Sequence, residues 1–207
     1  KVTVVDTGLH LKVGEYIMQH GIPTTDVFSF SMAGQRWIDH EWLWQVLLYS
    51  LRQAFGDWGL ISLQAGMTVT MFLILLLLGY RRDRIFLVAF LLGLVPLVAP
   101  TRPLMRPDNV SLWFSLVYIF LLWLFLKRSW TIYVLFILQV LWTNIHGFFI
   151  FGPLFALVIL ASEYAKRHLP LPYEWNTIGR LSDDEYRRLK KIGVAVTLAC
   201  FINPQFV

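Results

Sequence analysis

The N-terminal part of the sequence concentrates acidic and histidine side chains that could move a proton. Asp6 and His10 are four residues apart, so both would lie on one face of a helix. Further carboxylates and imidazoles follow at Asp26, Asp39, His40 and Glu41. A partly desolvated carboxylate can act as general base toward a hydroxyl, with an imidazole nearby to tune its pKa.

These residues also have structural interpretations. Asp6 and Asp39 could cap helices, and Asp26 could be a turn residue. We take Asp6, Asp26 and His10 as candidate catalytic residues, and His40 and Glu41 as candidate substrate-binding residues.

Two later segments add groups that could bind phosphate or sugar. Arg102 and Arg106 lie in a proline-containing stretch, and the guanidinium fork matches phosphate oxygens. Asn144 and His146 interrupt two apolar runs and could donate to a phosphate or a sugar hydroxyl. The alternatives are that the arginines anchor spans at lipid headgroups and that residues 142–147 form a tight turn between helices.

Other chemistries lack their motifs. The sequence contains no glycine-rich phosphate loop, no HExxH and no GxSxG. Cys200 is the only cysteine, so neither a disulfide framework nor a thiolate zinc site can be built. Nucleotide hydrolysis and thiol chemistry therefore lose support, and a metal requirement is left open, with a divalent ion as the only cofactor considered.

The composition indicates a membrane protein. Of the 207 residues, 57% are hydrophobic and only 15% are charged, which is too apolar for an ordinary soluble domain. The formal net charge of +5 comes mainly from Lys and Arg beside apolar segments, where membrane topology explains them. We expect no nucleic-acid partner.

Six apolar runs are candidates for membrane spans: Trp58–Gly79, Ile85–Pro100, Val110–Leu126, Trp130–Ile145, Phe148–Ala165 and the shorter Ile192–Ile202. Positive residues between them recur at 81–84, 127–128 and 166–191. Placing these connections in the cytoplasm satisfies the positive-inside tendency. Residues 1–57, the Arg102 segment and the His146 turn then share the outer face.

The predicted fold is therefore all-α, a polytopic transmembrane helical bundle with a helical extracytoplasmic first loop. Residues 1–57 form that loop, with one helix from Asp6 to Gly21 and a second, amphipathic one starting near Asp39. Residues 58–207 form the bundle, with a cytoplasmic loop near 166–191 that contains a short solvated helix. We expect the chain to be part of a longer protein.

Several of these segments resemble one enzyme group. They are Asp6-Thr-Gly-Leu-His10, Gly21-Ile-Pro23-Thr-Thr-Asp26, Trp37-Ile-Asp-His40-Glu41-Trp42, Arg102-Pro103, Trp142-Thr-Asn144-Ile-His146-Gly147 and Asn203-Pro204. Together they resemble bacterial GT-C type membrane glycosyltransferases. The chain departs from that pattern at Val4, where another acid is common, and at Gly8-Leu9, where an aromatic pair is common.

The resemblance implies an inverting enzyme of the bacterial inner membrane whose active face is extracytoplasmic. The donor would be a polyprenyl-phosphate-linked sugar, and the acceptor a glycan, lipid or protein. Asp6 would be the preferred catalytic residue and Asp26 the second. The alternative is a non-enzymatic membrane protein, namely a lipid-linked-sugar flippase or carrier, or an assembly subunit.

Overall fold

The computed structural model describes residues 5–80, 82–98 and 107–204 of the chain. Within these residues the protein has eight α-helices, two short 3₁₀ helices and no β-strand. The helices are α1 (Val5–His20), α2 (Trp42–Phe55), α3 (Asp57–Gly79), η1 (Arg82–Arg84), α4 (Ile85–Val98), α5 (Pro107–Leu124), α6 (Thr131–Ile145), η2 (Gly147–Ile150), α7 (Phe151–His168) and α8 (Asp183–Ala199). The all-helical prediction is confirmed for this part of the chain.

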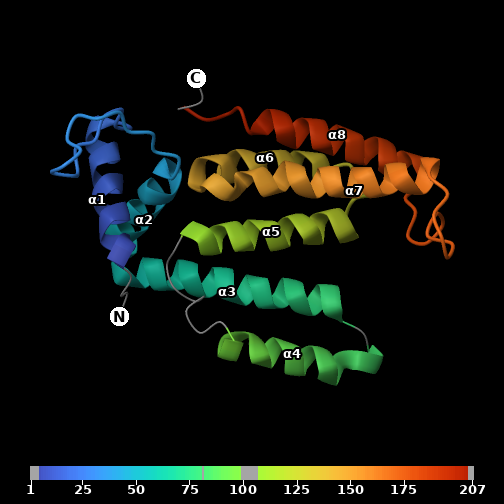
Figure 1. Ribbon diagram of the computed structural model, residues 1–207. Helices are drawn as coiled ribbons and strands as arrows, with labels where there is room; N and C mark the ends of the chain where they lie inside the picture. Colours follow the sequence, from blue (N-terminus) through green and yellow to red (C-terminus); the bar gives the residue numbers. More distant parts are fainter. Residues whose placement is uncertain (1–4, 81, 99–106, 205–207) are drawn as a thin grey trace.

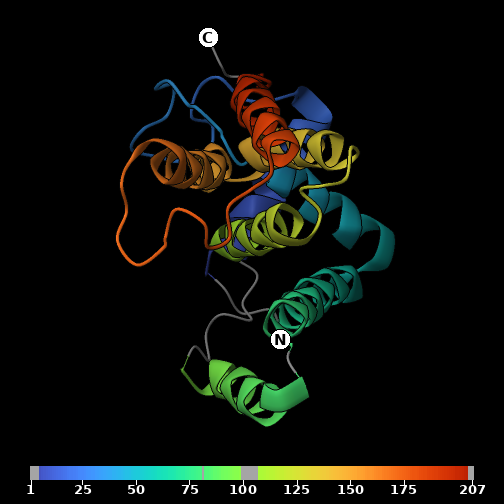
Figure 2. The same cartoon turned by 90° about the vertical axis from the view of Figure 1, so that its right-hand side faces the viewer.

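The long helices run side by side, and α1 and α2 lie across one of their ends (Figure 1). Seen along the bundle, α5, α6, α7 and α8 cluster together, with α3 and then α4 on one side (Figure 2). The helical bundle therefore has two distinct ends. One carries α1, α2 and the C-terminal end of α8, and the other carries the loop between α7 and α8.

Three helical segments are long and apolar enough to cross a membrane: α3, α5, and η2 continued by α7. The other predicted spans are shorter. Helix α6 is apolar but has 15 residues, about 22 Å at 1.5 Å per residue, against roughly 30 Å of hydrocarbon. Helix α4, with 14 residues, is shorter still.

The predicted C-terminal span from Ile192 to Ile202 is wrong in its boundaries. Helix α8 begins at Asp183 and ends at Ala199, so the charged helix and the apolar run form one continuous helix. Its start is fixed by a capping box, in which Ser182 and Glu185 each accept a hydrogen bond from the backbone N–H of the other. The sequence from residue 183 to residue 199 contains no Pro, so the helix continues through the apolar run without a break.

The core of the bundle is aromatic and aliphatic. Phe114 of α5 stacks on Trp142 of α6 with ring centroids 5.3 Å apart, and both side chains are buried. Gln139 is fully buried between the helices, where it accepts from the Tyr118 hydroxyl at 2.7 Å and donates to the Phe149 carbonyl at 3.0 Å. These partners offset the cost of burying its amide.

A glycine sets the approach of α1 to α2. A Cβ added at Gly14 would overlap the backbone carbonyl of Gln45 and lie 2.9 Å from the Cβ of Tyr49. Glycine therefore lets the two helices pack at backbone distance. Helix α1 ends before Gly21, whose φ of 86° is the left-handed conformation that glycine accepts readily. This packing carries His10 toward the start of α2.

Candidate functional site

The centre of the candidate site is Glu41, the residue immediately before α2. One carboxylate oxygen, Oε2, lies 3.9 Å from Nδ1 of His10 in α1. The other, Oε1, lies 3.6 Å from Nε2 of His146, which follows α6. These separations exceed hydrogen-bond length but bring opposite charges into contact when an imidazole is protonated. Three segments that are distant in sequence thus meet at one carboxyl group.

Hydrogen bonds from Trp142 through Ser111 hold the Nδ1 side of the His146 imidazole. The indole N–H of Trp142 donates to Ser111 Oγ at 2.9 Å, and the same oxygen lies 2.7 Å from Nδ1 of His146. An indole N–H can only donate, so Ser111 has its own proton to give to Nδ1. We assign neutral His146 the Nε2–H tautomer on this network, and that N–H faces Glu41.

Asp39 holds the backbone of Glu41. Its Oδ1 accepts from the Glu41 N–H at 3.1 Å and from the Gln45 amide at 3.2 Å. The Asp39 side chain is buried, and burial raises its pKa above the ordinary value. The residue therefore acts as a local turn and cap residue, which is the structural interpretation that its sequence position allowed.

Asn144 ties three segments together. Its Oδ1 accepts from the Trp42 indole at 2.9 Å, and its amide donates to the carbonyls of Val140 at 2.7 Å and Ile202 at 2.8 Å. The amide oxygen and both amide hydrogens are thereby engaged by the protein. Asn144 positions Trp42, next to Glu41, against the end of α6.

Burial and neighbouring acids give Glu41 an unusual pKa. Loss of solvation is the main cause, and the charges of Asp39, Asp6 and Asp108 add to it, raising the pKa of Glu41 to about 7. Burial lowers the pKa of His10 and His146 below the ordinary histidine value. A carboxyl with a pKa near 7 can gain and lose a proton near neutral pH, which suits proton exchange.

Asp6, the preferred catalytic candidate, is exposed in the first turn of α1. It lies near enough for its charge to raise the pKa of His10 and of Glu41. The structure thus brings Asp6, His10, Glu41 and His146 to the same end of the bundle.

Asp26, the second catalytic candidate, is engaged within its own loop. Its carboxylate accepts from the N–H groups of Phe28 and Ser29, at 2.8 and 2.9 Å, and from the Ser29 hydroxyl. These hydrogen bonds lower the pKa of Asp26. A low-pKa carboxylate is a weak base, so the geometry favours the turn role for this residue.

The remaining candidate residues are His40, Arg102 and Arg106, and the structure describes only the first. His40 is exposed and lies beside the turn after α6, because an added Cβ at Gly147 would be 4.0 Å from its Cδ2. Arg102 and Arg106 lie outside the described residues. The predicted approach of these two guanidinium groups to Asp6 therefore stays a prediction.

Ser111 is the member of this cluster that sequence reasoning did not single out. It lies early in α5, which the apolar pattern presented as a span starting at Val110. Asp108 lies three residues earlier, on the same helix face. The serine was visible in the sequence, but its partners Trp142 and His146 were not.

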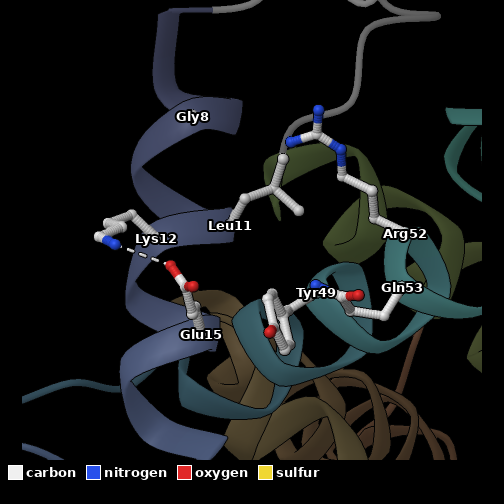
Figure 3. Close-up of a pocket in the computed structure, with 7 residues that line it drawn as sticks. All are labelled: Gly8, Leu11, Lys12, Glu15, Tyr49, Arg52 and Gln53. Carbon is white, nitrogen blue, oxygen red and sulfur yellow. Dashed lines mark hydrogen bonds and ion pairs between the residues drawn. The ribbon is translucent and has the colours of Figure 1, made fainter. Parts of the chain in front are cut away.

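Two grooves adjoin this end of the molecule. The first, of about 610 Å³, lies beside Trp42, Leu141, Asn144 and Ile202, and its lining is mainly apolar. The second, of about 440 Å³, lies between α1 and α2 and is more polar, as Figure 3 shows. Its lining consists of Gly8, Leu11, Lys12, Glu15, Tyr49, Arg52 and Gln53. In the described ranges, no group of three or more His, Cys, Asp or Glu side chains is arranged to hold a metal ion.

Comparison of the chain with protein-family models, with curated proteins and with solved structures gives no match. The functional assignment therefore rests on the residues and their geometry.

Proposed function

We propose that this protein is an integral membrane glycosyltransferase that moves a sugar from a polyprenyl-phosphate carrier to an acceptor hydroxyl on the extracytoplasmic face. The observation that carries the proposal is the meeting of Glu41 with His10 and His146 at one end of membrane-length helices. Proton-transfer groups at a membrane boundary suit a reaction whose donor is held in the lipid.

The proposed topology is a polytopic bundle in the bacterial inner membrane. The end opposite the candidate site carries Lys127, Arg128 and the basic segment 166–191. The positive-inside tendency puts that end in the cytoplasm, which leaves Glu41 on the outer face. The shorter helices α4, α6 and α8 would complete the bundle beside the three long ones.

In the proposed reaction an acceptor oxygen attacks the anomeric carbon of the donor sugar. The bond from that carbon to the phosphate oxygen breaks, and the polyprenyl phosphate leaves with the electron pair. The acceptor proton passes to a carboxylate, either Asp6 or Glu41. Asp6 is the more accessible of the two, whereas Glu41 has the pKa matched to neutral pH.

The grooves supply the two binding surfaces that the reaction needs. The apolar groove is lined by Trp42, the residue after Glu41, and by Asn144, and it suits a prenyl chain. The polar groove between α1 and α2 presents Tyr49, Gln53 and Glu15 (Figure 3) and suits a hydroxyl-bearing acceptor.

The test is transfer of label from radiolabelled polyprenyl-phosphate sugars by membranes that contain the full-length protein. General-base assistance typically contributes roughly a hundred- to ten-thousand-fold, so Asp6→Asn and Glu41→Gln should lower the rate by up to that order. Glu174→Gln is the matched control, because it removes the same charge from an exposed carboxylate. Glu174 lies between α7 and α8, at the opposite end of the bundle, and lines neither groove.

Normal transfer by both Asp6→Asn and Glu41→Gln would refute the assignment of the base. If wild-type membranes move no label but carry the lipid-linked sugar across vesicle membranes, the protein is a carrier instead. The same outer cluster would then recognise the headgroup rather than catalyse its transfer.

A further inference from the structure

A further apolar groove lies between α5 and α7. It has a volume of about 780 Å³. Its walls are apolar side chains of both helices, among them Ile119, Trp123, Phe151, Leu154 and Val158. All five of these side chains are exposed on the surface of the bundle. In the proposed membrane placement this groove faces lipid.

The groove ends in charged residues at the end of the bundle opposite the candidate site. Lys127 and Lys166 line that end together with Glu163 and Glu185. Figure 1 shows α7 running into the loop that leads to α8 at this end of the bundle. Apolar walls thus lead to a polar mouth within a single groove.

Both acids at the mouth have partners in the protein. Glu163 is buried, and its oxygens lie 3.0 Å from Lys166 Nζ and 3.9 Å from Arg167 Nε. Glu185 accepts the Ser182 N–H at 2.8 Å as part of the capping box and pairs with Lys127 at 3.7 Å. This separation is longer than a hydrogen bond, and the Lys127 side chain is 80% exposed. The Lys127 ammonium is therefore open to solvent and can turn toward a ligand at the groove mouth.

The surrounding surface is basic. Residues 127–128 and 163–191 contain nine Lys and Arg against five Asp and Glu, a formal excess of four positive charges. Arg188 adds a guanidinium beside the mouth, where it donates to the Lys127 carbonyl at 2.7 Å. A positive field of this kind is complementary to a phosphate.

Exposed aromatic side chains indicate where the groove mouth would lie in a bilayer. Trp123 on α5 and Tyr164 on α7 are exposed, and each precedes a lysine of the mouth by a few residues. Trp and Tyr prefer the headgroup level of a bilayer, where lipid phosphates are found. Basic pockets between helices on the cytoplasmic side are also a known way to bind anionic lipid headgroups.

We propose that this groove binds an anionic diacyl phospholipid, with its acyl chains between α5 and α7 and its phosphate at Lys127. The inference goes beyond sugar transfer and depends only on the membrane placement. A protein without transferase activity would still bind the lipid, so the two proposals can fail separately.

The experiment compares phosphatidylglycerol with phosphatidylcholine of identical acyl chains, titrated into the purified full-length protein and followed by native mass spectrometry. One basic residue near an anionic lipid changes its affinity by about five-fold. Phosphatidylglycerol should bind several-fold more tightly, and Lys127→Gln should remove about five-fold of that preference. Lys191→Gln is the control, because it removes the same charge from an exposed position of α8 that does not line the groove.

A second variant tests the apolar part of the site. Val158→Trp fills the groove from an exposed wall position and should lower the occupancy of both lipids without unfolding the protein. Equal binding of the two lipids by the wild type would overturn the proposal. So would unchanged phosphatidylglycerol binding by Val158→Trp, or a wild-type groove that takes up neither lipid because another segment of the protein fills it.

Discussion

Nε2 of His146 lies 3.6 Å from Oε1 of Glu41, although 104 residues separate the two in the sequence. The pair joins the turn after α6 to the residue that precedes α2. Ser111 on one side and Asp39 on the other hold its two members in place. Because the contact spans the interface between the first helical pair and the bundle, it couples the fold of the N-terminal segment to the chemistry of the site.

The first prediction concerns the pH dependence of transfer. A general base must be ionised, and the pKa of Glu41 is raised to about 7. If Glu41 takes the acceptor proton, the rate should rise with pH around a midpoint near 7. In Glu41→Gln the residual rate should lose this rise, whereas Asp6→Asn should keep it. A rise near pH 7 that survives in Glu41→Gln would assign the ionisation to another group.

The same carboxyl should make stability depend on pH. The ordinary pKa of Glu41 is 4.5 and its folded value is about 7, so the folded state holds a proton that the unfolded chain releases between these values. The associated stability is complete below pH 4.5 and is lost as pH rises through 7. Its size is about 3 kcal/mol, and the side chain is only 23% exposed.

Thermal unfolding in detergent at pH 5 and pH 8 measures this effect. The wild type should lose more stability than Glu41→Gln over that interval. His10 and His146 act in the opposite direction, because their pKa values are lowered and their contribution is lost as pH falls below the ordinary value of 6.5. Both histidines remain in Glu41→Gln, so the difference between the two proteins reports the carboxyl together with its contacts to the imidazoles.

The second prediction concerns Ser111. Replacement by Ala leaves the buried Trp142 N–H and Nδ1 of His146 without this oxygen, which costs about 1–3 kcal/mol. Transfer should also fall, because His146 loses the bond that sets its tautomer. Ser115→Ala is the control on the same helix, since Ser115 donates only to the Ser111 carbonyl. Equal loss of stability and transfer in the two variants would contradict the assigned network.

Local signals were sufficient to predict the elements that carry the site. Asp6 and Gly21 bracket the first helix, found as Val5–His20, and the apolar run from Trp58 predicted α3, found as Asp57–Gly79. Asn144 to Gly147 was expected to interrupt two helices, and α6 ends at Ile145 before η2 begins at Gly147. Helix caps, turns and apolar runs are determined by residues close together in the sequence, so they can be predicted from the sequence alone.

The pairing around Glu41 could not be predicted in the same way. The sequence placed Glu41 in a group of acids and histidines, but its central position depends on the packing of α1 on α2 and of α2 on α6. The raised pKa of Glu41 depends on burial by the same packing. Ser111 was missed because a hydroxyl in an apolar run carries no sign of the long-range partner it will meet.

The third prediction concerns the packing of α1. Gly14→Ala puts a methyl group into the Gln45 carbonyl, and overpacking of this kind typically costs about 1–3 kcal/mol. The melting temperature should fall, and transfer should fall with it because His10 moves away from Glu41. Gly8→Ala is the control on the same helix. A Cβ there meets nothing within 4 Å, so Ala should be neutral or slightly stabilising through its better helix propensity.

The fourth prediction concerns orientation in the membrane. Phe30, in the loop between α1 and α2, is fully exposed, and Arg180, between α7 and α8, is exposed at the opposite end. In a Cys200→Ser background, a membrane-impermeant maleimide added to intact spheroplasts should label Phe30→Cys and not Arg180→Cys. Permeabilised membranes are the control for access, and there both should react. The basic end should stay inside because moving nine Lys and Arg across the membrane opposes the positive-inside tendency. Labelling of Arg180→Cys in intact spheroplasts would place Glu41 and its histidines in the cytoplasm, away from an extracytoplasmic donor.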